Sequence, residues 1–272
     1  MVSKEKFTTD CINLFAWCPG NQIEIHCTGD VDLFDLPMIG FESAADPLFE
    51  KYKEKGIVGP MFFKPEEWMS GAKTVVSMFF PFTATVRDSN RETLGRPSTE
   101  WLYGRIEGQQ FLNGYMARLQ RQLEEAGIRA CVPSIDARFK LRIEPEWGDF
   151  RADSRWSERH TAYACGLGTF SLTRGLITEK GMAGRFASII LDAEFEPDER
   201  PYTGIYDYCI RCGACAAKCP AKAISLKHGK NNLKCRLYLN KTKRKYSPRY
   251  GCGKCQVGVP CECRAPGLAT LG

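Results

Sequence analysis

The sequence lacks any apolar run long enough to cross a membrane. Its best uncharged apolar stretch, residues 74–82, is far shorter than the roughly 20 residues that a membrane-spanning helix needs. The first ten residues carry charges and no apolar core, so they do not have the form of a secretory signal. These absences predict a soluble, cytoplasmic protein with no membrane contact.

Motifs for nucleotide chemistry are also missing. No glycine-rich loop ends in Gly-Lys-Ser or Gly-Lys-Thr, so nucleotide hydrolysis has no support in the sequence. The segment Gly166-Leu167-Gly168 differs from the dinucleotide-binding fingerprint, because it follows a predicted helix and lacks the third glycine and the later acidic residue. Neither class of phosphate-binding loop is therefore predicted.

The chain of 272 residues is long enough for one large domain or two. Its first part alternates predicted strands and helices, which favours a mixed α/β (α+β) layer over a helical bundle. Strands are predicted at 23–27, 73–81, 128–132 and 186–191, helices at 47–55, 98–126 and 157–166 with another starting at 65, and a loop at 176–184. An acidic, proline-flanked stretch at 194–201 predicts a boundary between an α/β domain (1–198) and a second domain (199–272).

Cysteine is abundant and unevenly placed. Of 14 cysteines, nine crowd into the last quarter of the chain. The other five lack the spacing of metal ligands and are predicted to be small buried apolar residues: Cys11, Cys18, Cys27, Cys131 and Cys165.

The central motif is the run Cys209-Ile-Arg-Cys212-Gly-Ala-Cys215-Ala-Ala-Lys-Cys219-Pro. This is the bacterial ferredoxin pattern, in which three thiolates hold one 4Fe-4S cube and the fourth reaches a second cube. Small residues between the cysteines let the thiolates converge. A zinc site would need two well-separated cysteine pairs, and a disulfide framework would need an oxidising compartment. The run therefore predicts iron–sulfur clusters.

Five cysteines downstream supply the remaining ligands. The simplest allocation gives Cys219, Cys235, Cys252 and Cys255 to the second cluster. The first cluster (Cys209, Cys212 and Cys215) is then completed by Cys261 or Cys263. Cys261 is preferred, because the neighbouring glycine and proline permit a tight return of the chain.

Two further features invite a functional interpretation. The segment from Lys227 to Arg249 is rich in lysine and arginine with interleaved tyrosines, so it predicts a surface for nucleic acid or for an acidic electron carrier, or else a solvated loop between the cluster-binding halves. His160 lies close to Asp153 in sequence, which suggests acid–base chemistry or, alternatively, a structural hydrogen bond.

The order of motifs resembles the epoxyqueuosine reductase family, which is related to the reductive dehalogenases. The likeness covers roughly residues 40–265 and rests on the segment at 164–170, the cysteine run at 209–220, Lys-Cys-Arg-Leu-Tyr-Leu at 234–239 and Gly-Cys-Gly-Lys-Cys-Gln at 251–256. It implies a nitroreductase-like cofactor domain followed by a ferredoxin-like domain with two 4Fe-4S clusters. It also implies cobalamin with its lower base detached, and the same allocation of cysteines.

The resemblance also implies roles for individual residues. Asp153 is the nearest match to the family's catalytic aspartate, with His160 as the alternate proton donor. Gly166, Leu167 and Gly168 fall in the segment expected to contact the cofactor. The family's C-terminal helical-repeat domain, used near tRNA by longer members, is not expected here, and the interval after the second cysteine group differs from the usual one.

The sequence thus predicts an iron–sulfur oxidoreductase. Its two clusters relay electrons from a flavodoxin or ferredoxin to a cofactor, cobalamin, which reduces a small-molecule or tRNA-borne substrate. The alternative is a ferredoxin-like electron carrier or interaction protein without an organic cofactor.

Overall fold

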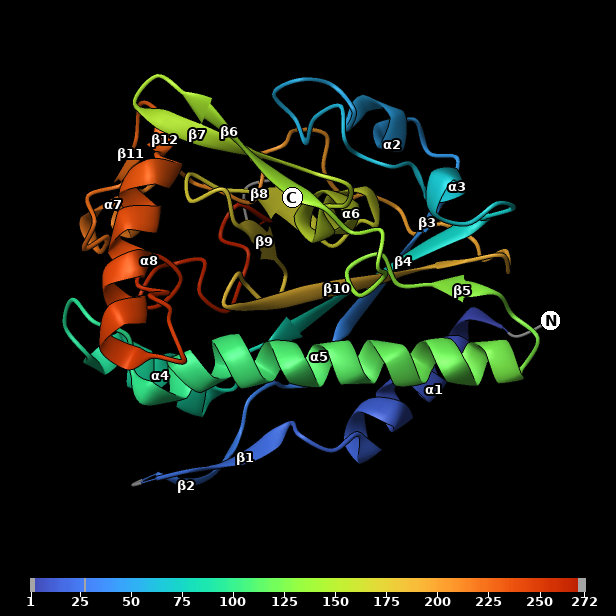
Figure 1. Ribbon diagram of the computed structural model, residues 1–272, viewed down its shortest axis with the longest axis horizontal. Helices are drawn as coiled ribbons and strands as arrows, with labels where there is room; N and C mark the ends of the chain where they lie inside the picture. The colour runs from blue at the N-terminus through green and yellow to red at the C-terminus, as the bar shows by residue number, and fades with distance from the viewer. Residues whose placement is uncertain (1–2, 27, 269–272) are drawn as a thin grey trace.

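A four-stranded antiparallel sheet covered by the long helix α5 (Thr99–Glu125) forms the centre of the fold (Figure 1). The structure, a computed structural model, describes residues 3–26 and 28–268. The strand order is β3 (Met38–Ser43), β4 (Thr74–Pro81), β10 (Gly184–Leu191) and β5 (Ala130–Cys131). All eight residues of β4 are buried, so this strand is covered on both faces.

Shorter elements surround this sheet. Four pairs of strands form separate two-stranded antiparallel sheets: β1 (Gln22–Ile25) with β2 (Gly29–Asp32), β6 (Leu141–Glu146) with β7 (Asp149–Ser154), β8 (Gly168–Phe170) with β9 (Leu176–Thr178), and β11 (Ile224–Ser225) with β12 (Gly229–Lys230). The other helices are α1 (Lys4–Trp17), α2 (Pro47–Lys51), α3 (Pro65–Trp68), α4 (Ala84–Glu92), α6 (Glu158–Ala164), α7 (Ala214–Ala217) and α8 (Asn232–Tyr246).

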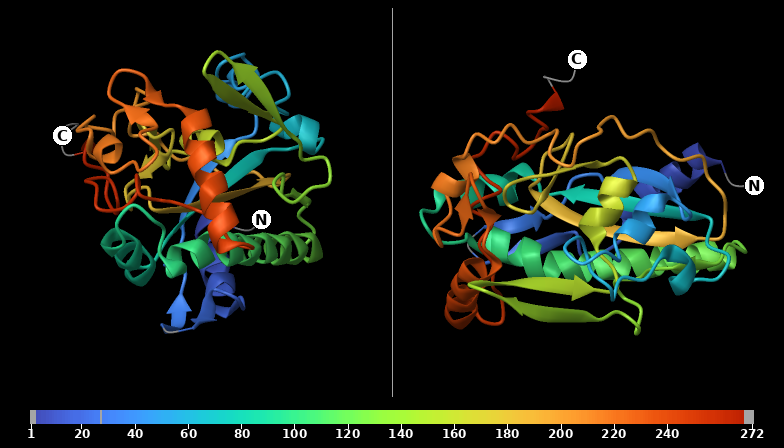
Figure 2. Two further views of the ribbon diagram at one scale, coloured as in Figure 1. Left: turned by 60° about the vertical axis from the view of Figure 1, so that its left-hand side comes forward. Right: turned by 90° about the horizontal axis from the view of Figure 1, so that it is seen from above.

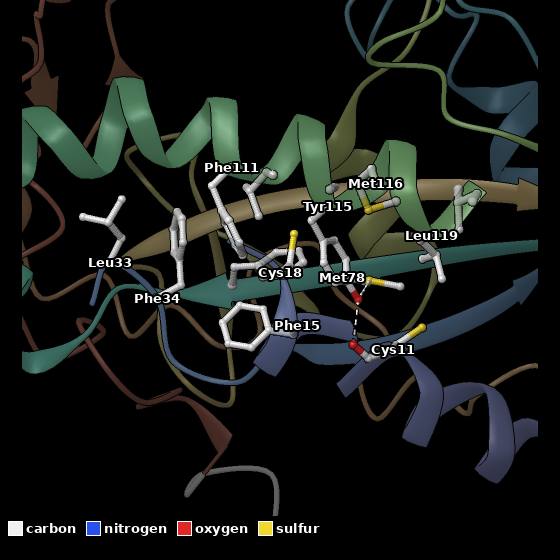
Figure 3. Packing of buried hydrophobic residues seen from close by; sticks show 14 of the residues in the cluster. Cys11, Phe15, Cys18, Leu33, Phe34, Met78, Phe111, Tyr115, Met116 and Leu119 are labelled. Carbon is white, nitrogen blue, oxygen red and sulfur yellow. Dashed lines mark hydrogen bonds between the residues drawn. The ribbon is translucent and has the colours of Figure 1, made fainter. Parts of the chain in front are cut away.

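Helix α5 begins and packs as its sequence predicts. The hydroxyl of Ser98 accepts a hydrogen bond from the Trp101 amide at 3.1 Å, which caps the first turn. Apolar side chains at three- and four-residue steps point from α5 towards the sheet and α1 (Figure 3). Within this layer the Tyr115 hydroxyl donates to the Cys11 carbonyl at 3.0 Å. The predicted helix at 98–126 is therefore confirmed.

Glycines inside α5 permit close contact with aromatic rings. A β-carbon at Gly108 would lie 2.8 Å from the ring of Phe34, whereas one at Gly114 would meet only the end of the Arg118 side chain at 3.3 Å. We expect Gly108→Ala to lower the free energy of unfolding by about 1–3 kcal/mol, because the buried ring must move. The matched Gly114→Ala variant should keep or raise stability by up to about 1 kcal/mol, because alanine favours the helix. Chemical denaturation compares the two, and equal effects would contradict this packing.

Several other predictions can be compared with the structure. The predicted strands at 73–81 and 186–191 are confirmed as β4 and β10, and the fold is mixed α/β. Cys11, Cys18, Cys131 and Cys165 are buried, as predicted, while Cys27 lies outside the described residues. No helix in the described ranges combines the length and apolar character needed to cross a bilayer.

Two local predictions were wrong. The stretch at 176–184, predicted as a loop, contains β9, which is a strand only because it pairs with β8. The basic segment, for which a solvated loop was one alternative, forms α8. The side chain of Asn231 caps α8 by accepting a hydrogen bond from the Lys234 amide at 2.8 Å. Both elements depend on contacts or caps that hydrophobic periodicity does not reveal.

Hairpin β6–β7 extends beside α8, as both views in Figure 2 show. The side chain of Asn232 donates to the Phe150 carbonyl at 2.9 Å, and the Leu233 amide donates to the Asp149 carboxylate at 2.9 Å. The first turn of α8, three residues before Cys235, is thereby attached to a hairpin from the first part of the chain.

Candidate cluster sites and an adjoining recess

The cysteines of the C-terminal region form two groups. In the first, burial raises the pKa of the Cys261 thiol to about 12, and the nearby charges of Cys209, Cys215 and Cys212 raise it further. These four residues together line one small cavity, whose space, including the solvent at its mouth, is about 340 Å³. Cys261, which lies 46 or more positions further along the chain, is therefore brought to the same cavity as the other three.

The second group consists of Cys219, Cys235, Cys252 and Cys255. Burial raises the pKa of Cys255 to about 12, and the charges of Cys252, Cys235 and Cys219 contribute in the same direction. The amide of Ala223 donates a hydrogen bond to the Cys219 sulfur at 3.3 Å. Backbone donors to sulfur are one of the means by which proteins tune iron–sulfur clusters.

The two groups have the same members as the allocation predicted from spacing. Cys263 is exposed, and its charge is not among the main causes that raise the pKa of Cys215, Cys252, Cys255 or Cys261. Across residues 3–26 and 28–268, no three His, Cys, Asp or Glu side chains converge on a position for a single metal ion. Convergence on one point is not expected of a cube, whose ligands each bind a different iron atom. That these cysteines bind clusters stays a prediction.

The chemistry of both groups fits a cluster. Each contains partly buried thiols whose pKa values are raised, so ionised sulfurs are unfavourable there without a cation. A metal coordinated by thiols favours their deprotonated form. The local backbone also fits, because Gly213 adopts a left-handed φ of 79° just before α7, between Cys212 and Cys215.

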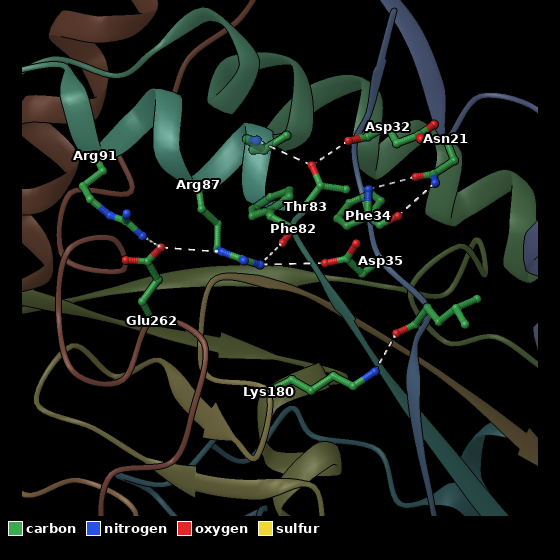
Figure 4. Close-up of polar contacts among 12 residues, drawn as sticks. Asn21, Asp32, Phe34, Asp35, Phe82, Thr83, Arg87, Arg91, Lys180 and Glu262 are labelled. Atoms are coloured by element: carbon green, nitrogen blue, oxygen red, sulfur yellow. Dashed lines mark hydrogen bonds and ion pairs between the residues drawn. The ribbon is translucent and has the colours of Figure 1, made fainter.

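Glu262 anchors the segment that carries Cys261. Its carboxylate pairs with Arg91 at 2.6 Å and with Arg87 at 3.5 Å, both on α4, as Figure 4 shows. It also accepts a hydrogen bond from the Gly258 amide at 2.5 Å. The long interval between Cys255 and Cys261 is thus held in a defined loop. Sequence reasoning missed Glu262, because its partners lie about 170 positions away.

A group of cationic side chains lies beside the second cysteine group, where a β-carbon at Gly251 would lie 3.0 Å from the Arg105 side chain, and we call its surroundings the recess. We define it by Arg105 of α5, Arg159 of α6, Arg185 of β10 and Tyr250. Arg159 is exposed, yet burial is the main cause that lowers its pKa; burial also lowers the pKa of the partly exposed Arg185 to about 10. The charges of Arg105 and Arg159 also disfavour the charge on Arg185, so these guanidiniums influence one another. Tyr250 belongs to the recess and also adjoins the second cysteine group, because Gly251-Cys252 follows it directly in the chain.

A carboxyl group that the sequence did not single out as a site lies on α6, next to Arg159 in the chain. Glu158 precedes Arg159, and burial raises its pKa to about 7. The Ser188 hydroxyl donates to its Oε2 at 2.6 Å and in turn accepts from the Trp156 indole at 2.8 Å. Its Oε1 has no hydrogen-bond partner in the described chain. Only the burial of its carboxyl group distinguishes Glu158 from a surface glutamate, and this burial cannot be seen in the sequence.

Asp153, the predicted catalytic aspartate, is fully buried at the end of β7. Its Oδ1 accepts a hydrogen bond from the Met61 amide at 3.2 Å, and its Oδ2 pairs with Arg142 at 3.3 Å. A β-carbon on Gly59 would lie 2.6 Å from the carboxylate. In this structure Asp153 therefore connects the 59–61 loop to the hairpin, and its catalytic role stays a prediction.

His160, the alternate proton donor, packs between aromatic rings. Its ring centroid lies 5.2 Å from that of Tyr52 and 4.8 Å from that of Phe170, and its Nδ1 lies 2.7 Å from the Ser157 hydroxyl. Burial, followed by the charge of Arg159, lowers the pKa of His160 to about 3. The imidazole is therefore neutral near pH 7, which suits the structural interpretation that the sequence left open.

The segment predicted to contact the cofactor packs against the protein itself. A β-carbon at Gly168 would lie 1.9 Å from the Ile177 carbonyl oxygen, and one at Gly166 would lie 3.0 Å from that of Glu199. Leu167 is buried. The glycines are thus required by neighbouring backbone, and contact of these three residues with a cofactor stays a prediction.

Comparisons with known proteins support an iron–sulfur motif in the cysteine run. A 4Fe-4S binding domain matches residues 202–225, which include the cysteine run. Tetrachloroethene reductive dehalogenases of Desulfitobacterium hafniense and Dehalobacter restrictus are 40% identical over 65 residues, a stretch that makes up 24% of this chain and 12% of each relative.

Solved structures extend the likeness to most of the chain. An epoxyqueuosine reductase crystallised with a modified tRNA-Tyr stem loop is 19% identical with a TM-score of 0.51, over 94% of this chain and 66% of that one. A catabolic reductive dehalogenase is 16% identical with a TM-score of 0.51, over 84% of this chain and 30% of that one. The chain thus spans about two thirds of the former and a third of the latter. The resemblance predicted from the sequence is confirmed as a shared fold.

Proposed function

We propose that this chain, which shares its fold with epoxyqueuosine reductases and reductive dehalogenases, is an iron–sulfur oxidoreductase. Two 4Fe-4S clusters relay electrons to an acceptor bound in the recess, where a substrate is reduced. The single observation that carries this proposal is the position of Tyr250, which lines the recess and directly precedes the Gly251-Cys252 pair of the second group. An electron that leaves the second cluster is thereby delivered beside the recess.

The polar lining of the recess fits a corrinoid. Cobalamin carries amide groups and a phosphodiester around its rim, and the guanidiniums of Arg105, Arg159 and Arg185 are donors for such acceptors. When bound, cobalamin supplies a reducible cobalt centre. The chain itself contributes the donors that orient the ligand.

The proton that accompanies reduction comes from Glu158 in this proposal. A carboxyl with a pKa of about 7 is protonated in a large part of the molecules at neutral pH. The bond from Ser188 fixes one oxygen and leaves the other free to carry the proton. His160 is neutral and Asp153 is held in contacts with the 59–61 loop and Arg142, so Glu158 is the more suitable acid.

A corrinoid titration tests the proposed function. Cobalamin added without oxygen to cluster-loaded protein should change its absorption to that of the form without its lower base. Addition of dithionite should then reduce it faster than in a matched sample without protein. An unchanged corrinoid spectrum would contradict the cofactor assignment.

The alternative is an electron carrier or interaction protein without an organic cofactor. The exposed lysines and arginines on α8 favour it, because such a surface attracts acidic redox partners such as flavodoxin or ferredoxin. The same surface would attract the phosphates of a tRNA-borne substrate. Tight co-purification of a corrinoid or flavin would eliminate the carrier, whereas cluster-loaded protein that exchanges electrons with a carrier and binds no cofactor would support it.

A further inference from the structure

A lysine is buried between two cysteines of the second group. Lys254 lies between Cys252 and Cys255 in the chain and is only 5% exposed. Its Nζ donates hydrogen bonds to the backbone carbonyls of Asn90 and Thr93 and, at 2.8 Å, to the Thr93 hydroxyl. An ammonium has three N–H donors and no acceptor, and three oxygens accept from this one. The surroundings of Lys254 therefore suit its charged form.

No carboxylate in the described part of the chain pairs with this ammonium. Its three acceptors are uncharged, and no salt bridge within residues 3–26 and 28–268 includes Lys254. The first cysteine group differs in this respect. Glu262, the buried charge that follows Cys261, pairs with two arginines of α4. The buried charge beside the second group is thus unpaired, whereas the one beside the first group is compensated.

The corner between α4 and α5 fixes the position of the ammonium relative to the cysteines. Asn90 of α4 is fully buried, and its side-chain amide donates to the Cys252 carbonyl at 3.1 Å and accepts from the Ser98 amide at 3.0 Å. A β-carbon at Gly253 would lie 2.0 Å from the Trp101 ring, so the loop lies directly against α5. Asn90 contacts both the ammonium and Cys252, and the two therefore share one support.

A buried cation acts on a nearby cluster through its charge. Reduction adds an electron to a cube, and a positive charge stabilises the reduced form. The effect is larger where burial keeps water and salt from screening the charge. Lys254 meets these conditions, because it is buried, unpaired and located between two of the cysteines of the second group.

We propose that the Lys254 ammonium raises the reduction potential of the second cluster and so directs electrons from the first cluster towards the recess. In this step one electron moves from the reduced first cluster to the oxidised second cluster, and no bond forms or breaks. An external electron carrier then reduces the first cluster again. This inference rests on the proposed function for the presence of the two clusters, and it adds a direction of electron flow set by a residue that binds no iron.

A redox titration followed by electron paramagnetic resonance tests the role of Lys254. Lys254→Gln keeps a donor and removes the charge. One of the two cluster potentials should fall, by about tenfold in the equilibrium constant or about 59 mV for a one-electron couple. Lys218→Gln is the matched control, because Lys218 precedes Cys219 of the same group but is exposed, and its loss should shift the potential far less. Unchanged potentials in Lys254→Gln, or equal shifts in both variants, would overturn the inference.

A second pair of variants decides the question if Lys254→Gln loses its cluster. Thr93→Asp keeps Lys254 and places a carboxylate where the hydroxyl now accepts from the ammonium, and Thr93→Asn has a similar shape without charge. Thr93 is partly exposed, which leaves room for either side chain. Thr93→Asp should lower the potential of the second cluster, and Thr93→Asn should leave it unchanged. If Thr93→Asp does not lower it, the charge of Lys254 does not set the potential.

Iron analysis of the same samples separates this inference from the proposed function. Protein with both clusters whose potentials do not depend on Lys254 refutes the role of Lys254 alone, whereas protein without clusters refutes both. The Cys261→Ser variant, which lacks a ligand of the first cluster, assigns the shift. In that background Lys254→Gln should still lower the remaining potential, and an unchanged value would show that the effect belongs to the wrong cluster.

Discussion

A Cys261→Ser variant is expected to lose one 4Fe-4S cluster, whereas Cys263→Ser keeps both. Cys261 lies among Cys209, Cys212 and Cys215 and lines their cavity, while Cys263, two positions on, is exposed. A hydroxyl is a poor substitute for a thiolate on iron, so the first cube should be lost or degraded. Iron, acid-labile sulfide and the electron paramagnetic resonance of the reduced proteins measure the outcome.

The two serine variants control for each other. Both replace one sulfur in the same short segment, and Glu262 anchors that segment in each. Cys261→Ser should therefore retain about half the iron of wild type, with the signal of the second cluster unchanged. The reverse result, with cluster loss in Cys263→Ser and none in Cys261→Ser, would refute the grouping of the cysteines and the path that the chain takes after Gly258.

Glu158→Gln should lower the rate of the reductive step by about a hundredfold or more. The amide keeps the size and the contact with Ser188 at one oxygen but cannot donate a carboxyl proton. Binding of the ligand should change little. Steady-state kinetics with reduced protein separates the effect on the rate of reduction from the effect on ligand binding. Asp153→Asn is the comparison variant, because Asp153 is the catalytic aspartate that the family resemblance predicts. A full rate in Glu158→Gln and a collapse in Asp153→Asn would return the acid role to Asp153.

The pH dependence of protein stability gives a second test of Glu158. Its pKa in the folded protein, about 7, lies above the ordinary value of 4.5. The folded state therefore binds the proton more tightly than the unfolded state, and this contribution to stability is complete below pH 4.5 and is lost as pH rises through 7. The loss is on the order of 2 kcal/mol after allowance for the partial exposure of Glu158. Glu158→Gln should lack this slope, and the wild-type rate should fall above pH 7.

The sequence predicts the regular parts of the fold well. Residues 98–126 and 73–81 carry their own signals, namely a three- and four-residue apolar period and a continuous apolar run. Hairpin β6–β7 and helix α1 carry no comparable pattern. The exposed face of the hairpin includes Leu141 and Ile143, and its position depends on contacts with α8. Tertiary contacts of this kind outweigh local preference and are not visible in one sequence.

Within the candidate site, residues close together in the chain can be predicted from the sequence, and residues far apart in the chain cannot. Spacing grouped most of the cysteines and left Cys261 or Cys263 open, and in the structure Cys261 lies with Cys209, Cys212 and Cys215. The recess had no such signal. Arg105, Arg159 and Arg185 are ordinary surface residues in sequence, and only the approach of α5, α6 and β10 gives them a common environment.

The proposed electron transfer depends above all on two cubes bound by the C-terminal cysteines, and iron analysis of the wild-type protein tests for these cubes most directly. Protein purified without oxygen should contain about eight iron atoms and about eight acid-labile sulfides per chain, with a brown colour that dithionite bleaches. A colourless protein that contains zinc and no labile sulfide would contradict the account at its foundation.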